Sequence, residues 1–349
     1  MKYRLLEWLV CPQCRSPDLA LQTTKTSGGR VHHASWEEGE LDLPGLNHSD
    51  RELVEIEEGS LHCAECASVY RIVDGIPRML PEGFKSGPET AHRWTEFDGE
   101  VPEYEENFQD MVEPLGPGDY LGQLVLDAGC GFGRHSFFAA RYGAEVVALD
   151  CSAQAVAAAR SNTKHLNRVH VVQGDLECPP FRQDIFDSVL CFGVLHHLDN
   201  AQQAFSSLKP LVRPNGRLQV WVYGPRQGSI AHVSKWLHGT ANSMSDEQLH
   251  SFSKGIARGL RIFSHTPFRA LRHTPLLRSV ANHLPGHDHH KWPFDVVVAD
   301  IYDRLRVPVT TYITGELLER WYADEGYSDI QVVRRVRNTE SFRGMGRRR

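Results

Sequence analysis

The chain has 349 residues, a hydrophobic content of 41% and a formal net charge of −6. A chain of this length is long enough for two domains and for a sizeable buried core. It contains no apolar stretch of about 18 residues, so we expect no membrane span. The slightly acidic charge gives no reason to expect general binding to nucleic acid.

Two cysteine pairs mark the N-terminal part of the chain. Cys11 and Cys14 form one Cys-x-x-Cys pair, and Cys63 and Cys66 form the other. No signal peptide precedes them, so the eight cysteines of the chain predict a reducing, cytoplasmic location. In that setting such pairs bind metal more often than they form disulfides, and four thiolates suit a tetrahedral structural zinc ion. The alternative is a set of reducible or merely buried cysteines.

An acidic run and an aromatic segment follow. Residues 37–58 hold nine Asp and Glu against one Arg, which is typical of a solvated insertion. We therefore assign residues 1–82 to a zinc-binding domain with an acidic insertion, and residues 83–123 to a linker. The linker carries Trp94 and Tyr104, whose rings could cover a cationic ligand and favour it electrostatically. Ordinary packing on a sheet edge is the alternative.

From residue 124 onward, strand and helix signals alternate. This alternation predicts an α/β domain over residues 124–349, with a parallel, doubly wound sheet covered on both faces. Serine caps and glycine ends delimit several of the helices. The predicted strands are 124–129, 144–150, 169–175, 186–193, 216–223 and 328–336, and the predicted helices are 134–143, 152–165, 201–212 and 314–327.

The alternation of strand and helix signals is interrupted between residues 224 and 310. We predict that these residues form a helical cap inserted over the substrate. Nine of the 19 histidines lie between residues 224 and 300. The cluster at His287, His289 and His290 could ligate a metal, although such clusters are more often polar loops.

Further polar groups follow the histidine cluster. A substrate pocket could be lined by Tyr302, Asp303 and Arg306, and we take Tyr302 as a catalytic candidate. The basic tail, residues 341–349, is predicted to be frayed. Its arginines, together with those just before it, either bind an anion or form a solvated face; they are Arg334, Arg335, Arg337 and Arg343.

A glycine-rich turn follows the first strand of the α/β domain. The pattern is Asp127, Gly129, Gly131 and Gly133, between a buried strand and a helix. Glycine at such a turn lets the backbone approach a ligand closely. The carboxylate beside the turn would repel a pyrophosphate but suits a ligand with a cationic amine. S-adenosylmethionine carries no phosphate, and it has both a sulfonium and an ammonium group.

Two other nucleotide motifs do not fit this turn. A P-loop would need Lys and Ser or Thr after the last glycine, but Arg134 and His135 stand there. The dinucleotide fingerprint would need glycine where Arg134 or Ser136 stands. Both phosphate-binding interpretations therefore fail on the residues themselves.

Two further carboxylates end neighbouring strands. Asp150 lies about 20 residues after the glycines, where a carboxylate can accept both ribose hydroxyls. Asp175 ends the next strand, where it can accept from an adenine amino group, and the Leu176 amide can donate to a ring nitrogen. A helix-capping role is the alternative for each aspartate taken alone. All three aspartates fall at the edge where open α/β sheets bind ligands.

At this point the resemblance to a family is specific. Five successive motifs are similar to those of class I S-adenosylmethionine-dependent methyltransferases of the type-11 kind: VLDAGCGFGRHS, VVALDCS, GDLECPPF, FDSVLCFGVLHHL and PNGRLQVWVYG. The resemblance implies a Rossmann-like sheet of seven mostly parallel strands. It also implies that the cofactor contacts Asp127, Gly129, Gly131, Gly133, Asp150, Cys151, Asp175 and Leu176, with Phe192 and Gly193 near the departing methyl group.

The N-terminal frame also resembles a known family. The segments LVCPQCRSPDL and LHCAECASVYRIVDGIPRML are similar to the small zinc-ribbon activator subunit of tRNA and protein methyltransferases, whereas the acidic insertion between them departs from its compact form. The same ribbon occurs fused ahead of bacterial methyltransferase domains. The resemblance implies a closed structural zinc site without chemistry of its own.

The loop after the fourth strand offers catalytic candidates. His196 and His197 would lie beside the methyl group, and a histidine can act as a base when the acceptor is a hydroxyl. Packing or orienting the loop is the alternative. The Asn-Pro-Pro-Tyr motif of many enzymes that methylate planar amines is absent. Cys191 lacks the Pro-Cys loop that a nucleophilic cysteine would need.

These features predict an S-adenosylmethionine-dependent methyltransferase that acts at O or N of a small molecule or of a carrier-linked glycan or natural product. An RNA methyltransferase is the alternative that the ribbon and the basic tail favour. A cofactor-binding scaffold without catalysis is the second alternative. A homodimer is left open.

Overall fold

The computed structural model describes most of the chain. The described residues are 1–27, 54–84, 102–225, 236–237, 239–241, 243–274, 279, 284, 286, 290–306, 311–335 and 341–349, without the side chains of residues 299 and 303. Several predicted features lie outside them, namely Trp94, His287, His289, Arg337 and most of the acidic insertion. The end of that insertion, from Glu55, is part of a strand instead of a solvated loop.

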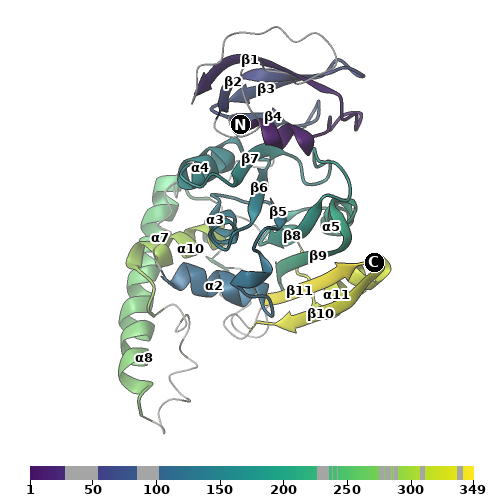
Figure 1. Cartoon of the computed structure of the whole chain (residues 1–349). Coiled ribbons are helices and arrows are strands. Elements are labelled where there is room, and N and C mark those ends of the chain that lie inside the picture. The colour runs from purple at the N-terminus through teal and green to yellow at the C-terminus, as the bar shows by residue number, and fades with distance from the viewer. Residues whose placement is uncertain are drawn as a thin grey trace.

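One sheet of eleven strands runs through the described part of the molecule (Figure 1). Its spatial order is β1-β2-β3-β4-β7-β6-β5-β8-β9-β11-β10. The strands are β1 Leu19–Ser27, β2 Glu55–Cys63, β3 Val69–Val73, β4 Ile76–Met79, β5 Leu124–Ala128, β6 Glu145–Asp150, β7 Val169–Gly174, β8 Phe186–Phe192, β9 Val212–Tyr223, β10 Tyr327–Arg334 and β11 Ser341–Arg348.

The seven strands from β7 to β10 form the predicted α/β sheet. Neighbouring strands from β7 to β9 are parallel, whereas β11 is antiparallel to both β9 and β10. The predicted fold class is therefore confirmed. The prediction of a frayed tail is wrong, because the tail is β11 and hydrogen-bonds to a strand on each side.

The N-terminal ribbon joins this sheet and does not form a sheet of its own. Strand β4 pairs in parallel with β7, where Arg78 lies opposite Gln173. The four ribbon strands thereby raise the strand count from the expected seven to eleven. Arg160 of the α/β domain also pairs with Glu55 of the ribbon at 2.5 Å. The boundary near residue 82 separates two sequence patterns but not two sheets.

Helices cover both faces of the α/β sheet. Alternate residues of β5 point to opposite sides: Val125 belongs to the core cluster that includes Phe108 and Phe138, and Leu126 belongs to the cluster that includes Phe205 and Trp321. This period of two is the reason that a strand buried on both faces reads as an apolar run. Helices α2, α3 and α4 supply the first layer, and α5 and α11 supply the second. These helices are α2 Pro102–Val112, α3 Arg134–Arg141, α4 Ala153–Thr163, α5 Ala201–Leu208 and α11 Gly315–Asp324.

Side-chain caps start the helices where the sequence predicts them. The Ser152 hydroxyl accepts from the Ala155 N–H at the start of α4, and Thr314 accepts from Leu317 N–H at the start of α11. Each cap satisfies one of the N–H groups that a helix start leaves open. The shorter helical turns are η1 Tyr3–Glu7, η2 Pro117–Asp119, η3 Leu195–His197 and η4 Lys209–Leu211.

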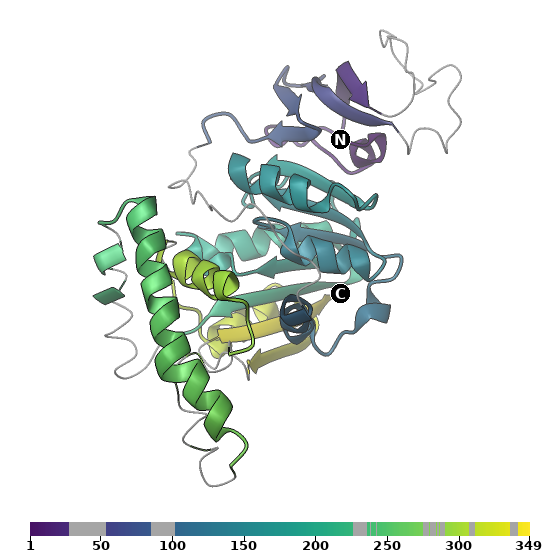
Figure 2. The same ribbon diagram turned by 90° about the vertical axis from the view of Figure 1, so that its left-hand side faces the viewer.

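The predicted cap is helical in its described part (Figure 2). One long rod joins α7, η5 and α8, and α10 packs along α7. Their bounds are α7 Asp246–Leu260, η5 Arg261–His265, α8 Thr266–Leu271 and α10 Phe294–Arg306. Ser245 and Gln248 form a capping box at the start of α7. Among the described residues, none of the helices has the length and apolar character needed to cross a membrane.

Candidate functional site

The glycine turn lies between β5 and α3, and hydrogen bonds to β6 fix its backbone. The N–H groups of Gly129 and Cys130 both donate to the carbonyl of Leu149, at 2.8 and 2.9 Å. Gly129, Gly131 and Gly133 all have positive φ, at +83°, +54° and +85°. Residues with a Cβ seldom adopt this conformation, so the backbone course itself requires glycine.

The three glycines serve different purposes. A Cβ at Gly129 would lie 2.3 Å from a methyl group of Val194, and one at Gly133 would lie 3.1 Å from Ala159. Those two glycines allow the turn to pack closely against its neighbours. A Cβ at Gly131 would meet no atom within 4 Å. Gly131 therefore faces open space, and it is the point where a ligand can lie on bare backbone.

Asp127 lies buried beneath this turn. Its Oδ2 accepts from the Ser136 hydroxyl at 2.6 Å, and its Oδ1 has no hydrogen-bond partner among the described residues. Burial raises the pKa of Asp127 to about 6, although the bond from Ser136 opposes the shift. The carboxylate thus holds a poorly compensated negative charge directly under the turn, which favours a cationic ligand.

Asp150 connects the ends of β6 and the glycine turn. Its Oδ2 accepts from the Gly131 N–H at 3.0 Å, and its Oδ1 accepts from the Ser152 N–H at 2.9 Å. A carboxylate has about four acceptor sites, and each Asp150 oxygen accepts one backbone bond here. The structure therefore brings the predicted ribose acceptor to the glycine turn.

The predicted adenine segment follows β7. Asp175 accepts from the Glu177 N–H at 3.0 Å, which fixes the turn after the strand. Leu176 is buried, and its carbonyl accepts from the Ser207 hydroxyl at 2.7 Å. Cys151 is exposed directly after Asp150, and its carbonyl accepts from the Gln173 amide at 2.8 Å. These residues stand at the carboxyl ends of adjacent strands, as the sequence predicts.

The residues predicted to lie near the departing methyl group, Phe192 and Gly193, stand at the carboxyl end of β8; we call this part of the site the methyl end. Phe192 is buried and meets the His135 ring edge-on at a centroid distance of 5.3 Å. Gly193 has φ +78°, and a Cβ there would lie 3.1 Å from the Trp221 ring. Aromatic side chains thus wall this end of the site. His135 and Trp221 were not among the residues chosen from the sequence, because only the topology brings them beside Phe192.

The two catalytic histidines differ in their surroundings. His196 is fully buried, and its Nδ1 accepts from the Tyr223 N–H at 3.3 Å. Burial lowers the pKa of His196 to about 2, and His197 adds to the effect, so the ring stays neutral. A buried neutral ring bonded to backbone fits the loop-orienting alternative. His197 is partly exposed, with its ring centroid 4.1 Å from that of His196.

The catalytic prediction for Tyr302 needs correction. Its side chain is fully buried between α7 and α10, in a cluster with Leu249 and Leu305. The hydroxyl donates to Asp246 Oδ1 at 3.1 Å. Tyr302 therefore holds the cap together and has no exposed surface to offer to a substrate.

Tyr104 belongs to the segment that the sequence analysis assigns to a linker, and the structure places it on a helix. It is on α2, and the Arg134 guanidinium lies 5.5 Å from its ring centroid. The Trp292 ring of the cap lies 6.5 Å from the Tyr104 ring. Arg134 directly follows the glycine turn, so Tyr104 connects α2, the turn and the cap.

Two of the four arginines proposed for anion binding, Arg335 and Arg343, are engaged with carboxylates. Arg335 is buried and pairs with Asp110, and Arg343 pairs with Glu113 at 2.5 Å. Burial lowers the pKa of Arg335, and the neighbouring Asp110 opposes this shift. These contacts contradict the interpretation of a solvated basic face for this part of the tail.

The four ribbon cysteines form one cluster. Their sulfur atoms all lie within 4.8 Å of one another, with Cys11 to Cys66 and Cys14 to Cys63 both at 3.5 Å. A tetrahedral zinc ion with bonds of about 2.3 Å would hold its sulfurs about 3.8 Å apart. The donor set and spacing therefore fit a structural zinc ion.

Matching turns support the four thiols. The Arg15 N–H donates to the Cys11 carbonyl at 2.8 Å, and the Ala67 N–H donates to the Cys63 carbonyl at 3.1 Å. Arg15 and Ala67 both have positive φ, at +67° and +58°. Two equivalent knuckles therefore present two sulfurs each, as a closed four-thiolate site requires.

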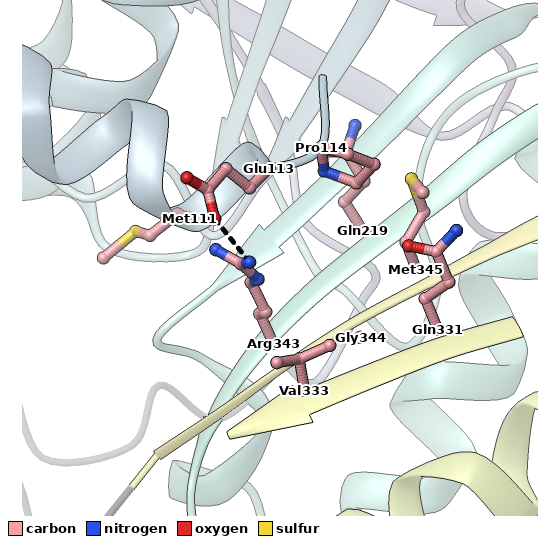
Figure 3. A pocket seen from close by; sticks show the side chains of 9 residues that line it. All are labelled: Met111, Glu113, Pro114, Gln219, Gln331, Val333, Arg343, Gly344 and Met345. Atoms are coloured by element: carbon pink, nitrogen blue, oxygen red, sulfur yellow. Dashed lines mark hydrogen bonds and ion pairs between the residues drawn. The ribbon is translucent and has the colours of Figure 1, made fainter. Parts of the chain in front are cut away.

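A cavity of about 370 Å³ lies apart from the glycine turn (Figure 3). It opens at the end of α2, between Met111 and the strands β9, β10 and β11. Gln219 and Met345 line it from the sheet, and the Arg343–Glu113 ion pair forms one wall. None of the predicted catalytic, cofactor-binding or zinc-binding residues lines this cavity, whereas Arg343, one of the arginines proposed for anion binding, does.

Comparisons with known proteins agree with the two-part chain. Residues 126–220 match a family model described as a methyltransferase domain, and residues 2–75 match one described as Trm112p-like protein. An uncharacterized methyltransferase of Mycobacterium bovis is 31% identical over 41% of this chain and 71% of its own length.

Two longer alignments have lower identity. An uncharacterized protein of a Synechococcus species is 26% identical over 74% of this chain, and the chain spans 58% of that relative's length. A ubiquinone biosynthesis O-methyltransferase of Albidiferax ferrireducens is 26% identical over 54% of this chain and 79% of its own length.

Proposed function

Because this chain belongs to the S-adenosylmethionine-dependent methyltransferases, we propose that it transfers a methyl group to a hydroxyl of a small molecule or carrier-linked natural product. The observation that carries the proposal is the glycine turn, where Gly131 faces open space beside the Asp150 carboxylate. The similarity to a ubiquinone biosynthesis O-methyltransferase supports oxygen as the accepting atom.

The donor lies across three strand ends in this proposal. Gly129, Gly131 and Gly133 line its methionine portion, and Asp127 supplies the negative charge that attracts its cationic groups. Asp150 and Cys151 line the ribose. Asp175 and Leu176 line the adenine. S-adenosylmethionine supplies a methyl group that its sulfonium already activates, so the chain mainly has to align the acceptor and exclude water.

His197 is the residue we propose to accept the hydroxyl proton. It ends η3, which begins two residues after Gly193, and the residue is partly exposed. His196 lies beside it as a neutral ring bonded to backbone, which suits a role in orienting the loop. A histidine nitrogen beside the departing methyl group can accept the proton of a hydroxyl acceptor as a general base.

Calorimetry with S-adenosylhomocysteine tests the donor site. Asp150→Asn should weaken binding at least about tenfold, because a hydrogen bond to a charged group contributes roughly 1.5–3 kcal/mol. Asp187→Asn is the matched control. Asp187 also accepts a backbone N–H, from Leu124 at 2.7 Å, but it lies at the amino end of β8, whereas the proposed donor site lies at the carboxyl ends of the strands. Absence of binding by the wild-type protein would refute the proposal.

Transfer of a labelled methyl group then identifies the acceptor class. Incorporation into hydroxylated small molecules, reduced by His197→Gln, supports the proposal. Incorporation into RNA instead would favour the RNA methyltransferase, although the paired arginines Arg335 and Arg343 count against it. Cofactor binding without any transfer would favour the scaffold.

A further inference from the structure

Helix α2 makes two kinds of contact along its length. Near its start, Tyr104 lies against Arg134 at the glycine turn. In its second half, Phe108 stacks on the ring of His135, with 6.0 Å between the ring centroids. On its inner face, Phe108, Met111 and Val112 are buried against the sheet. Helix α2 therefore lies over the turn and α3 as a cover, with its first residues nearest the proposed donor.

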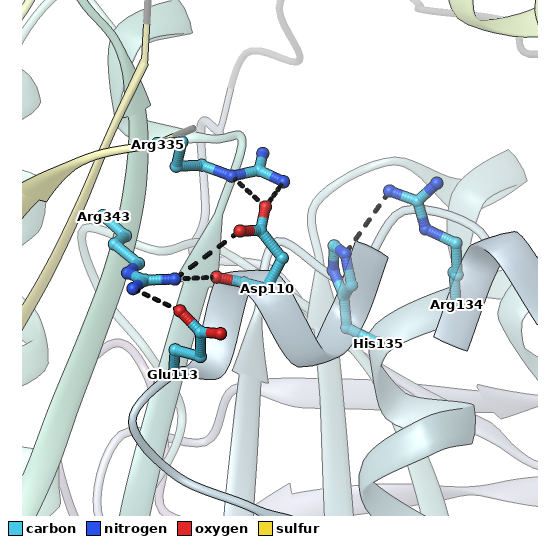
Figure 4. Close-up of polar contacts among 6 residues, drawn as sticks. All are labelled: Asp110, Glu113, Arg134, His135, Arg335 and Arg343. Carbon is cyan, nitrogen blue, oxygen red and sulfur yellow. Dashed lines mark hydrogen bonds and ion pairs between the residues drawn. The ribbon is translucent and has the colours of Figure 1, made fainter. Parts of the chain in front are cut away.

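The far end of α2 is held by the C-terminal strands (Figure 4). Arg335, which follows β10, donates from Nε to Asp110 Oδ2 at 2.7 Å and donates to the same oxygen from a second nitrogen. Arg343 of β11 donates to the Asp110 carbonyl and pairs with Glu113. Two arginines from adjacent strands thus hold the last turn of one helix.

The Asp110–Arg335 ion pair is almost completely buried, so its geometry is well defined. Only 3% of the Arg335 side chain and 15% of the Asp110 side chain are exposed. The Arg335 guanidinium also lies 5.5 Å from the centroid of the Trp221 ring, beside the proposed methyl end. Pairs this well enclosed are screened little by salt and have a defined geometry, unlike exposed ion pairs.

We propose that Asp110 and Arg335 are positioning residues that hold α2, and with it Tyr104, over the donor. This inference rests on the proposed function. An eleven-residue helix has little stability of its own, so its position depends on what it packs against. Three buried apolar side chains anchor the second half of α2, and the ion pair fixes its rotation and tilt. The C-terminal hairpin is thereby part of the donor site without touching the donor.

The test uses two variants and measures the rate at which S-adenosylhomocysteine dissociates. Arg335→Met removes the enclosed partner of Asp110 and leaves that carboxylate with Arg343 alone, 3.6 Å away, so both the melting temperature and the binding should suffer. The double variant Asp110→Asn/Arg335→Met removes both charges, so the melting temperature should recover. The dissociation rate should stay at least fivefold above wild type in both variants, with the association rate changed less than twofold. Hydrogen exchange over residues 103–112 should be faster in both.

Arg348→Met is the matched control. Arg348 lies in the same hairpin and pairs with Asp184, but it holds the loop before β9 and not α2. It should lower the melting temperature without changing the dissociation rate. A dissociation rate that returns to the wild-type value together with the melting temperature would overturn the inference, since the pair would then be merely structural. Failure of the wild-type protein to bind would instead refute the proposed function.

Discussion

Replacing Asp127 by Asn separates the stability of the protein from its affinity for the donor. Burial raises the pKa of this carboxyl from 3.8 to about 6. Since one pKa unit corresponds to about 1.4 kcal/mol, the ionised group destabilises the folded state by about 3 kcal/mol at neutral pH. Asparagine carries no charge, but its amide nitrogen inherits the position that has no partner. We therefore expect a net gain of about 1–2 kcal/mol.

The dependence on pH follows from the direction of the shift. The folded state binds the Asp127 proton more tightly than the unfolded state, so wild-type stability falls as pH rises from about 4 to 6. Above pH 6 this contribution stays constant. Asp127→Asn should remove that decline, and thermal melting at pH 5 and pH 7.5 measures the difference. The variant should melt higher at pH 7.5, by about 2–4 °C.

Affinity should change in the opposite direction. The ionised carboxylate attracts the ammonium and sulfonium of the donor, so Asp127→Asn should weaken S-adenosylmethionine binding at least about fivefold at pH 7.5. The difference should shrink toward pH 5, where the wild-type carboxyl is mostly protonated. Calorimetry at both pH values measures it. Equal affinities at pH 7.5, or a variant that melts lower than wild type at that pH, would refute the electrostatic reasoning.

The glycines and the cysteines supply two further predictions. Gly129→Ala should destabilise the fold by roughly 2–4 kcal/mol, because the new methyl group meets Val194. Gly131→Ala should destabilise the fold by only about 1 kcal/mol, but it should weaken S-adenosylhomocysteine binding at least about tenfold. Wild-type affinity in the Gly131 variant would contradict the assignment of this residue to the donor site. Elemental analysis should find one zinc ion per chain, and removing it with a chelator should lower the melting temperature of the whole chain and weaken cofactor binding about two- to fivefold; a chain without zinc would contradict the cysteine site.

The reason for the weaker binding without zinc is a short hydrogen-bonded path. Arg78 of the ribbon donates to the Gln173 side chain at 3.2 Å, and that side chain donates to the carbonyl of Cys151, next to Asp150. Arg15, beside Cys14, donates to the carbonyls of Pro179 and Phe181 after the adenine segment. Loosening of the ribbon therefore reaches both loops, contrary to the view of an independent domain.

Motifs at strand ends could be predicted from the sequence because their chemistry and spacing are local. Glycines, Asp127 and Asp150 each sit a fixed distance from a recognisable strand, and parallel strands end at the same edge. Tyr302 was misjudged although its pattern was readable. Val298, Tyr302 and Leu305 recur at helical spacing, which predicts the buried face of a helix and not a substrate contact.

Strand β11 could not be recognised from its own residues. Its glycines and arginines lack the alternation of apolar side chains that marks a strand. The structure gives the reason: Cβ atoms at Gly344 and Gly346 would lie 2.8 and 2.6 Å from the ring of Tyr322 on α11. The strand is glycine-rich because that aromatic ring lies too close to it for a Cβ at either position. Such a requirement depends on a partner elsewhere in the chain.

The pairing of β4 with β7 has a consequence for how the chain can be divided. In a methyltransferase half expressed alone, β7 would be the last strand of the sheet, with its hydrogen-bonding groups open to any other chain. Cutting the connection between residues 84 and 102 and supplying both pieces should therefore give a complex held by a shared ladder. The ribbon is then comparable to a subunit that is covalently linked to its partner. The linking peptide raises the local concentration of the ribbon, and the β4–β7 pairing determines how the ribbon binds.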